Sequence, residues 1–441
     1  MFCNGNGACH NWDPNDAMCP SWKGTRLRTH TPKGRASLIR KWLRQLDKKG
    51  TSTTHEVQKI HAQTSLQKLT SLPSKIKNSL AKKSGVYDFS HEVHESMMAC
   101  LACKSCTGSC PVKVDVPEFR SKFLGLYYSR YLRPTKDFFV GSLEKTLPLM
   151  SRFTRSYNFA MKMGLNYCLD KALGMSDSPL LSTIDFDREL RERDVYYTHN
   201  AYFKNLSEQD KKQSVIIVLD AFTRFFETEL VLDTIDLIRQ LGFMPWIAPF
   251  EANGKPLHVH GFRKEFGRIA KTTSEALNTL AKTNIPLVGI EPSMTLAYRS
   301  EYMKVVDNPP NVLLVQEWLA SQDLTHVQAS YGKNNGSDNS KTYHLLAHCT
   351  EKTNAAPAIK DWQTIFEKLG HKLEIVDIGC CGMAGTYGHE SENVGTSKKI
   401  YSLSWAAVIN NDSYKDSLVA TGFSCRSQVK RIDKKILFRL Y

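Results

Sequence analysis

Apolar and polar residues alternate with a helical period through much of the first half of the chain. Residues 35–46 place leucine, isoleucine and tryptophan side chains at the spacing of one helical face. Further helices are predicted over residues 92–99 and after Pro117, because a proline suits the first turn of a helix. Residues 137–176 also have a mainly helical pattern. We therefore expect this half to be an assembly of helices.

Two stretches of the first half lack this period. Residues 1–34 are rich in Gly, Pro and Asn and short of apolar periodicity, which favours a loop wrapped around something over a packed element. Residues 48–66 are polar throughout, so we predict an insertion or linker there.

The pattern changes after about residue 212, where short runs rich in Val and Ile alternate with amphipathic stretches. The predicted strands are 214–220, 243–249 and 285–290, followed in a second round by 343–349, 372–378 and 417–423. Strands that alternate with helices are typical of βαβ units, which form a parallel sheet with helices on its faces. The recurrence of the same order predicts two α/β half-domains.

Composition restricts the class of protein. The 441 residues are 41% hydrophobic, enough to bury a core in two or three domains. No uninterrupted apolar run reaches the roughly 18 residues that indicate a transmembrane helix. The first residues, MFCNGNGACHNW, lack the basic and apolar segments of a secretory signal. We therefore expect a cytoplasmic protein, in which twelve cysteines indicate metal or cluster ligands and not disulfides.

The formal net charge of +15 is concentrated near the N-terminus. Residues 1–90 contain 16 Lys and Arg against 5 Asp and Glu. This excess is typical of a solvated basic surface, but it also suits docking on an acidic partner or an anionic membrane surface. We expect no nucleic-acid binding, because the cysteines point to other chemistry.

The most specific motif is a run of four cysteines followed by a proline: Cys100, Cys103, Cys106, Cys110 and Pro111. Gaps of two residues let one loop curl three thiolates onto corners of a cubane cluster. In two-cluster ferredoxins the fourth cysteine of such a run ligates the other cluster. Four unrelated buried thiols would rarely have this spacing, so the motif predicts an iron–sulfur site.

A second, less regular group lies near the N-terminus and comprises Cys3, Cys9 and Cys19, followed by Pro20. If ligation is exchanged as in two-cluster ferredoxins, Cys19 completes a [4Fe–4S] site with the first three cysteines of the other motif. Cys3, Cys9 and Cys110 would then offer only three thiolates to a second cluster. That site could be [3Fe–4S], could recruit His10 or Asn6, or could be empty. Whether one or two clusters bind therefore stays open.

The C-terminal half contains a third group: Cys349, the adjacent pair Cys380 and Cys381, and Cys425. Each follows the end of a predicted strand, where a parallel sheet gathers its loops into one crevice. Four converging thiolates suit a [4Fe–4S] cluster or a tetrahedral Zn²⁺. The alternative is plain packing of small apolar side chains. The first half-domain lacks cysteines at the corresponding positions and should be free of metal. Cys168 is expected to be a core thiol on a helix.

These segments resemble a known family. CNGNGACHNWDPNDAMCPSWKG, CLACKSCTGSCPVKVDVPEF and GCCGMAGTYGHE resemble the C-terminal half of the large bacterial D-2-hydroxyglutarate dehydrogenases that contain FAD and iron–sulfur clusters. FAD-linked D-lactate dehydrogenases and the cysteine-rich "CCG" subunits of glycerol-3-phosphate dehydrogenase and heterodisulfide reductase are similar more distantly. The resemblance runs through most of the chain.

The resemblance implies an electron-transfer module that accepts electrons from a flavin-dependent D-2-hydroxyacid dehydrogenase and passes them to a quinone or another acceptor. The expected hydroxyacid is D-2-hydroxyglutarate. No flavin-binding stretch is found, so FAD is expected on a partner flavoprotein domain or subunit, and the chain is expected to be a fragment or half of a split pair. CCG domains typically end in a paired Cys-x2-Cys. Here Gln428 takes the last position, so a site with four thiolates is expected.

Two other functions remain open. The C-terminal cysteines could form a redox enzyme site, reducing disulfides as in heterodisulfide reductase or reducing a quinone, with His389 and Glu390 as acid and base groups. A polar pair at the start of a helix is the simpler interpretation of those two residues. Alternatively, the C-terminal site could bind Zn²⁺ and serve only to dock a flavoprotein.

The expected fold class is α+β and multidomain. A helical ferredoxin-like 4Fe–4S domain is predicted over residues 1–136, with its polar insertion, and a helical connector over 137–211. A CCG-like α/β half-domain without cysteines should occupy 212–335, and one with four cysteines 336–441. We expect the protein in the cytoplasm or peripheral to the inner membrane, and self-association stays open.

Overall fold

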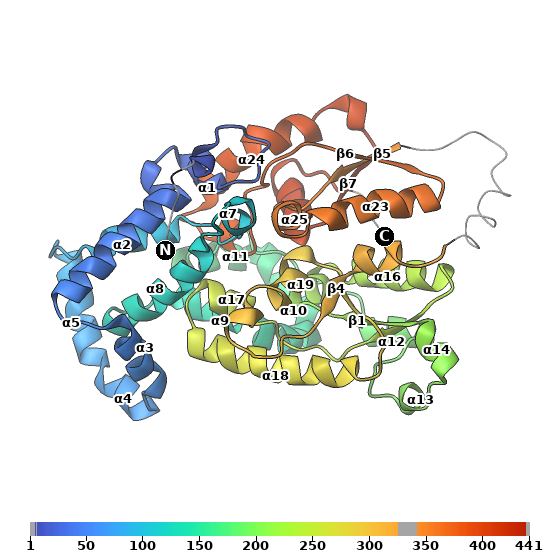
Figure 1. Ribbon diagram of the computed structural model, residues 1–441, viewed down its shortest axis with the longest axis horizontal. Coiled ribbons are helices and arrows are strands. Elements are labelled where there is room, and N and C mark those ends of the chain that lie inside the picture. The colour runs from blue at the N-terminus through green and yellow to red at the C-terminus, as the bar shows by residue number, and fades with distance from the viewer. Residues whose placement is uncertain (1–4, 6, 325–341, 438–441) are drawn as a thin grey trace.

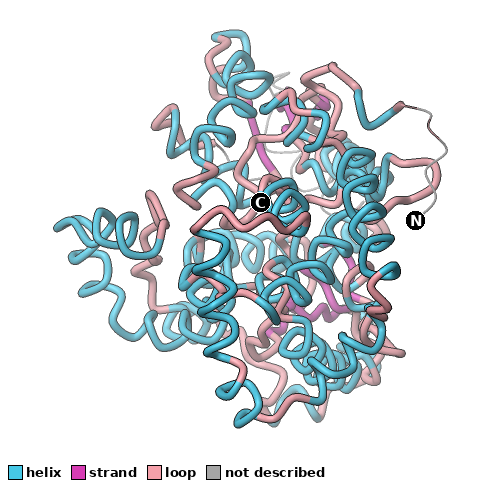
Figure 2. Tube along the Cα trace, turned by 90° about the vertical axis from the view of Figure 1, so that its left-hand side faces the viewer, coloured by secondary structure: helices cyan, strands magenta, loops and turns pink. Residues whose placement is uncertain are grey.

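The computed structural model describes residues 5, 7–324 and 342–437. Helices dominate, and the strands form two parallel sheets, so the coarse expectation of an α+β fold is confirmed. Figure 1 shows the N-terminal helices on one side of the two sheets, and Figure 2 shows the strands in separate groups with helices around them. Cys3 and Asn6 lie outside the described residues.

The N-terminal half consists of helices and short helical turns. Its α-helices are α1 (Pro20–Thr25), α2 (Pro32–Lys48), α3 (Thr53–Ala62), α4 (Ser65–Thr70), α5 (Leu72–Lys83), α6 (Ser90–Met98), α7 (Ser105–Ser109), α8 (Val116–Arg130), α9 (Thr135–Met150), α10 (Thr154–Ala160) and α11 (Asn166–Leu173). The helices predicted from apolar spacing are confirmed as α2, α6 and α8 to α11. Helix α2 begins after Thr31, whose hydroxyl accepts a hydrogen bond from the Gly34 amide at 2.9 Å.

The polar insertion expected over residues 48–66 differs from the structure, which contains α3 and the start of α4 in this region. Ser52 caps α3 through the His55 amide at 3.4 Å. Thr64 and Gln67 form a reciprocal capping box at the start of α4. These helices were not predicted because the segment is polar and has no apolar stripe. Their first turns are stabilised by capping side chains.

The C-terminal half contains the two sheets. Its helices are α12 (Phe186–Glu192), α13 (Ala201–Lys204), α14 (Glu208–Lys212), α15 (Ala221–Phe226), α16 (Thr228–Gln240), α17 (Lys255–Val259), α18 (Arg263–Ala281), α19 (Pro292–Tyr298), α20 (Val315–Ala320), α22 (Cys349–Asn354), α23 (Ala356–Lys368), α24 (Val394–Ile409) and α25 (Phe423–Ile432). Its strands are β1 (Ser214–Val218), β2 (Met244–Ile247), β3 (Leu287–Gly289), β4 (Val312–Leu314), β5 (Thr342–Leu346), β6 (Lys372–Ile375) and β7 (Leu418–Ala420).

Both sheets are parallel, as the alternation of strands and helices predicts. The first sheet has the order β2-β1-β3-β4 and the second β6-β5-β7. Strand β4 is absent from the predicted strands. The registers pair Ile216 with Trp246 in the first sheet and Leu345 with Ile375 in the second.

One continuous apolar core joins the two sheets. It includes Ile217 of β1, Ile235 of α16, Trp318 of α20, Trp362 of α23 and Leu345 of β5, all buried. Helices α20 and α23 pack directly on each other. The sheets therefore share their packing, and their carboxyl ends are held in a fixed relation to one another.

A close backbone contact joins the helical half to the second sheet. A Cβ added at Gly108 of α7 would overlap the carbonyl group of Thr353 in α22, so these two short helices touch through their backbones. Gly24 of α1 likewise lies close to α24, where a Cβ would meet the Ile400 side chain. Glycine is required at such positions because any side chain would push the helices apart.

Within the described parts of the chain, no helix has both the length and the apolar composition needed to cross a bilayer.

We predict that Gly108→Ala destabilises the protein by about 3 kcal/mol, because the added methyl meets a backbone carbonyl that cannot rotate away. Urea unfolding followed by circular dichroism measures the loss. Gly267 in α18 is the matched control, since a Cβ there meets no atom within 4 Å. Gly267→Ala should raise the free energy of unfolding by about 0.5–1 kcal/mol. Equal stability of Gly108→Ala and the wild type would contradict the contact.

Candidate functional site

The loop that carries Cys100, Cys103 and Cys106 has an unusual backbone. Ala102 and Lys104 both have positive φ angles, 54° and 59°, in the left-handed region that non-glycine residues rarely adopt. This shape turns the chain twice within five residues and directs successive cysteines inward. Strain of this kind persists where the surrounding structure enforces it, and it is common at functional sites.

Cys19 lies against this loop, as the ferredoxin-type exchange of ligands predicts. Cys19, Cys100, Cys103 and Cys106 line one small cavity between the N-terminal segment and the loop. Arg35 of α2 adjoins it, donating from Nη1 to the Cys19 sulfur at 3.8 Å. The structure therefore brings together four thiols although several helices separate Cys19 from the other three in the sequence.

The second expected set is described only in part. Cys9 and Cys110 line a neighbouring cavity together with Cys106. Cys3 and Asn6, expected at the same place, lie outside the described residues. His10 packs edge-on against Trp22, with ring centroids 5.6 Å apart. The position of Cys9 beside Cys110 agrees with the expected grouping.

The C-terminal cysteines meet at the carboxyl end of the second sheet. Cys349 begins α22 after β5, Cys380 and Cys381 follow β6, and Cys425 lies in α25 after β7. Their thiols are in contact in the order 349, 380, 381, 425. The expected convergence at strand ends is what the structure shows.

Burial dominates the electrostatics of these thiols. It raises the pKa of Cys19 to about 11 despite the nearby Arg35, and that of Cys103 to about 12. The pKa of Cys349 is raised well above its ordinary value by its contact with Cys380 and by burial. Without a bound cation these groups stay neutral at physiological pH. A coordinated metal changes this, because it deprotonates a thiol outright.

Among residues 5, 7–324 and 342–437, no three His, Cys, Asp or Glu side chains are placed to hold one metal ion. A single zinc draws its donors to within about 2.0–2.3 Å of one point. A cubane takes one thiolate at each of four separate iron corners, so its ligands line a cavity without meeting. Cys19, Cys100, Cys103 and Cys106 line one such cavity.

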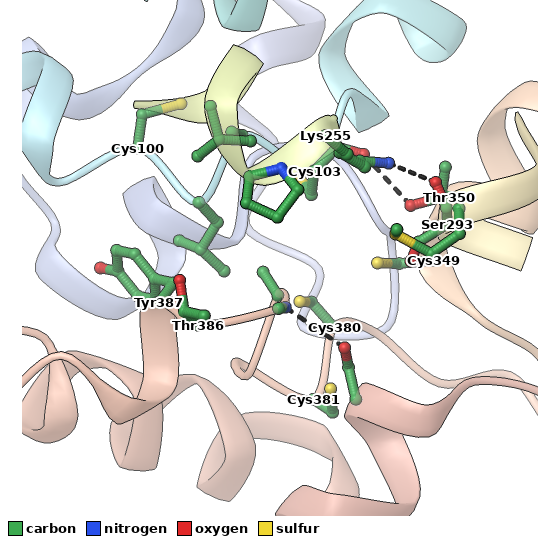
Figure 3. Close-up of a pocket in the computed structure, with 18 of the residues that line it drawn as sticks. Cys100, Cys103, Lys255, Ser293, Cys349, Thr350, Cys380, Cys381, Thr386 and Tyr387 are labelled. Atoms are coloured by element: carbon green, nitrogen blue, oxygen red, sulfur yellow. Dashed lines mark hydrogen bonds between the residues drawn. The ribbon is translucent and has the colours of Figure 1, made fainter. Parts of the chain in front are cut away.

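The N-terminal and C-terminal cysteine groups are neighbours. Cys100 and Cys103 line a larger cavity that Cys349, Cys380 and Cys381 also line, and Figure 3 shows these five side chains around it. The Thr350 hydroxyl donates to the carbonyl oxygen of Cys103 at 3.3 Å. The contact between α7 and α22 therefore places the two groups in the wall of one space.

A buried ion network beside the cysteine loop was not predicted from the sequence. Glu301 lies between Lys104 and Lys255, 3.4 Å and 3.9 Å from their Nζ atoms. Burial alone would raise the pKa of Glu301, but the two lysines lower it to about 2. These partners come from three distant segments and leave no local pattern that would reveal them.

His389 and Glu390 have structural partners. The His389 ring bonds the Ser176 carbonyl oxygen at 3.1 Å, and burial lowers the pKa of His389 to about 4. Glu390 pairs with Lys136 at 3.0 Å and lines the larger cavity. The simpler interpretation, a polar pair at the start of a helix, is wrong, because His389 ends a short 3-10 turn and α24 begins only at Val394. Both residues have structural contacts, and Glu390 also lines the cavity.

The expectation that Cys168 is a core thiol is wrong, because its side chain is exposed on α11. Gly164, with a φ angle of 109°, kinks the preceding helical turn. The helix α11 that follows the kink lies at the surface and buries none of its residues, so the apolar spacing around Cys168 does not mark a core face.

Known proteins resemble the chain along almost its whole length. The chain is similar to D-2-hydroxyglutarate dehydrogenases. The protein of that name from Pseudomonas putida is 45% identical over 438 residues, which cover 99% of this chain and 42% of the relative. The Escherichia coli protein is 42% identical over 437 residues, 98% of this chain and 42% of the relative. The chain thus spans less than half the length of these relatives.

A weaker similarity is to one component of the anaerobic glycerol-3-phosphate dehydrogenase of Escherichia coli, at 23% identity over 253 residues, 53% of this chain and 59% of the relative. No family model and no solved structure matches the chain.

These matches correct one expectation. The resemblance assigned the chain to the C-terminal half of such a dehydrogenase, and that description is wrong. Nearly the whole chain aligns with proteins named D-2-hydroxyglutarate dehydrogenase. The alignment covers 42% of the length of each of these two relatives. The homologues are dehydrogenases, and the similarity is to them along the whole chain.

The first sheet repeats the turn geometry of the cysteine site without its cysteines. Gly254 and Gly382 have similar φ angles, 78° and 83°, after β2 and β6. At the first of these turns the buried carboxylate of Glu144 accepts the amides of Asn253 and Gly254 at 3.0 Å and 2.7 Å. Burial raises the pKa of Glu144 from 4.5 to about 7.

This carboxyl group should make stability depend on pH. Its folded pKa lies above the unfolded one, so the folded state holds the proton more strongly and the free energy of unfolding falls as pH rises from about 4.5 to about 7. In Glu144→Gln that contribution should vanish, flattening the profile measured by urea unfolding between pH 5 and 8. Glu275→Gln on the exposed face of α18 is the control and should keep the wild-type slope. An unchanged slope in Glu144→Gln would show that Glu144 is ionised throughout.

Proposed function

We propose that this chain is an iron–sulfur electron-transfer protein that serves the oxidation of a D-2-hydroxyacid, with D-2-hydroxyglutarate as the first candidate. It accepts electrons from a flavin-dependent dehydrogenase, whose FAD is bound by a partner domain or subunit, and passes them to another acceptor. The observation that carries this proposal is the cavity lined by Cys19, Cys100, Cys103 and Cys106. The names of the relatives supply the substrate class.

The residues around this cavity fit a [4Fe–4S] cluster. Four cysteines are the usual ligand set, and the four that line this cavity are three buried residues and the half-buried Cys103. When bound, such a cluster supplies one-electron redox chemistry. Cys19, Cys100, Cys103 and Cys106 would hold it. Cys9 and Cys110, with Cys3, are the candidates for a second cluster.

The chain's own residues prepare this site in two ways. Arg35 is 1% exposed and donates to Cys19, to Ser21 and to the Ser96 carbonyl oxygen, so it holds a positive charge beside thiols that would be ionised on binding metal. Lys104 brings a second cation to the other side of the loop. Burial of the loop also excludes water, which strengthens these electrostatic interactions.

The group formed by Cys349, Cys380, Cys381 and Cys425 is proposed as a second metal site, with a [4Fe–4S] cluster or Zn²⁺ as its occupant. Its place beside the first group favours a redox role over docking alone, because both line one cavity. A site that reduces a disulfide or a quinone by itself is the alternative function. The raised pKa of its thiols disfavours disulfide exchange, which needs a thiolate.

The N-terminal helices support docking. Helix α5 packs on α8 through a polar contact. Asn78 of α5 donates a hydrogen bond to the Arg130 carbonyl oxygen of α8 at 2.9 Å. Its outer face exposes Ile76 and Leu80, and no Asp or Glu occurs in the sequence between Glu56 and Asp88. A basic amphipathic surface suits an acidic flavoprotein or an anionic membrane surface. Cytoplasmic location, peripheral membrane contact and self-association remain proposals.

Metal analysis of anaerobically purified protein tests the proposal. We expect about four iron and four sulfide per chain for one cluster, or about eight of each for two, with an EPR signal after dithionite. Cys103→Ser should lose at least half of the iron of the first site. Cys168→Ser, the same change at an exposed thiol, should keep all of it.

Protein that lacks iron and resists anaerobic reconstitution would overturn the electron-transfer proposal. Zinc in place of iron, lost in a variant with Cys380→Ser and Cys381→Ser, would favour the docking scaffold. D-2-hydroxyglutarate oxidation without added flavoprotein would contradict the assignment of FAD to a partner.

A further inference from the structure

The helices α4 and α5 carry an aliphatic stripe that the described part of the chain leaves exposed. Ser71, which joins the two helices, keeps helical backbone angles. The stripe has two members on α4 and three on α5, spaced three or four residues apart and 42–70% exposed: Leu66, Leu69, Leu72, Ile76 and Leu80. Figure 1 shows both helices at the outer edge of the helical half, away from the two sheets. Contiguous exposed apolar side chains of this kind mark an interaction site.

The side of α5 that faces the protein is polar. Asn78 donates to the Arg130 carbonyl oxygen, and the Ser79 hydroxyl accepts a hydrogen bond from the Leu132 amide at 2.9 Å. No residue of α5 is buried. A surface helix normally turns its apolar stripe to the core and its polar face to water. The helix α5 does the reverse, so packing within the chain does not explain its stripe.

The charge around the stripe is positive. Lys77 and Lys83 are exposed, and each lies three residues from Leu80, so they flank the stripe on the surface of α5. Lys48 and Lys49 at the end of α2 line a surface groove that α5 also lines. Residues 57–87 contain no Asp or Glu and six lysines: Lys59, Lys68, Lys75, Lys77, Lys82 and Lys83.

This chemistry distinguishes three kinds of partner. A symmetric contact with a second copy would bring lysines against lysines without a carboxylate to neutralise them. Protein interfaces are enriched in aromatic residues and Arg and depleted in Lys, whereas this stripe consists of Leu and Ile beside Lys. An anionic lipid surface offers acyl chains to the aliphatic side chains and phosphate groups to the lysines. The stripe and its lysines therefore favour a lipid surface.

We propose that the α4–α5 segment binds an anionic lipid bilayer, lying in the plane of its surface. The aliphatic stripe enters the outer acyl region, Lys77 and Lys83 contact lipid phosphates, and the polar face of α5 stays on α8. This inference does not rest on the proposed function, because it requires neither a metal cluster nor a flavoprotein.

Flotation of the purified full chain with lipid vesicles tests the proposal. We expect binding to vesicles of phosphatidylcholine and phosphatidylglycerol in equal parts, and at least about tenfold weaker binding to phosphatidylcholine alone. Raising the salt to about 0.5 M NaCl should weaken binding to the anionic vesicles, because salt screens the lysines.

A double variant locates the binding to the stripe. Ile76→Gln with Leu80→Gln removes two exposed aliphatic side chains of α5 and should weaken binding to the anionic vesicles at least about tenfold. Leu180→Gln with Ile436→Gln makes the same changes at exposed positions outside α4 and α5, and it should leave binding unaltered. Circular dichroism checks that both double variants keep the wild-type fold.

A second pair of variants tests the lysines. Lys77→Glu with Lys83→Glu should weaken binding to the anionic vesicles at least about tenfold, whereas Lys77→Arg with Lys83→Arg should preserve it.

Failure to bind anionic vesicles would overturn the proposal, as would binding that Ile76→Gln with Leu80→Gln leaves unchanged. Self-association that this variant abolishes, without vesicle binding, would assign the stripe to a second copy and contradict the lipid surface. Capture of a flavoprotein in place of vesicles would contradict it equally. Vesicle binding by protein that cannot hold iron would sustain this inference while the proposed function failed.

Discussion

The backbone contact between α7 and α22 is the constraint on which the site depends. Gly108 leaves room for the carbonyl of Thr353, and the Thr350 hydroxyl bonds the carbonyl oxygen of Cys103. One helix starts just after Cys103 and the other starts at Cys349. Their contact therefore joins two cysteine groups that are far apart in the sequence, and it closes the cavity between them. Without it the chain would contain two separate cysteine-rich parts.

Local spacing was sufficient to predict some of this arrangement. Two-residue gaps from Cys100 to Cys106 require a curled loop, and the structure forms it with Ala102 in the left-handed region. The ends of parallel strands lie at one edge of a sheet, so the convergence of the cysteines from Cys349 to Cys425 followed from their order. Both inferences depended only on neighbours in the chain or on a regular topology.

Features that depend on distant partners were missed. The ion network of Lys104, Glu301 and Lys255 joins three segments, and none has a local pattern that reveals the others. Cys168 was assigned to the core from its apolar neighbours, but α11 lies at the surface and buries none of its residues. The helices within 48–66 were not predicted because their sequence is polar, whereas capping side chains stabilise their first turns. In each case tertiary context or capping overrides the local period.

The two sheets have corresponding left-handed turns, at Gly254 after β2 and at Gly382 after β6, and different side chains surround each turn. After β2, a turn with Gly254 in the left-handed region is held by the buried carboxyl of Glu144, which accepts two backbone amides. After β6, the corresponding turn at Gly382 presents Cys380 and Cys381 to a cavity. A carboxyl that is satisfied by backbone amides has no capacity left for a ligand, whereas buried neutral thiols lack a strong partner of their own. The turn after β2 therefore acts as a rigid support, whereas the turn after β6 offers thiols to a cavity.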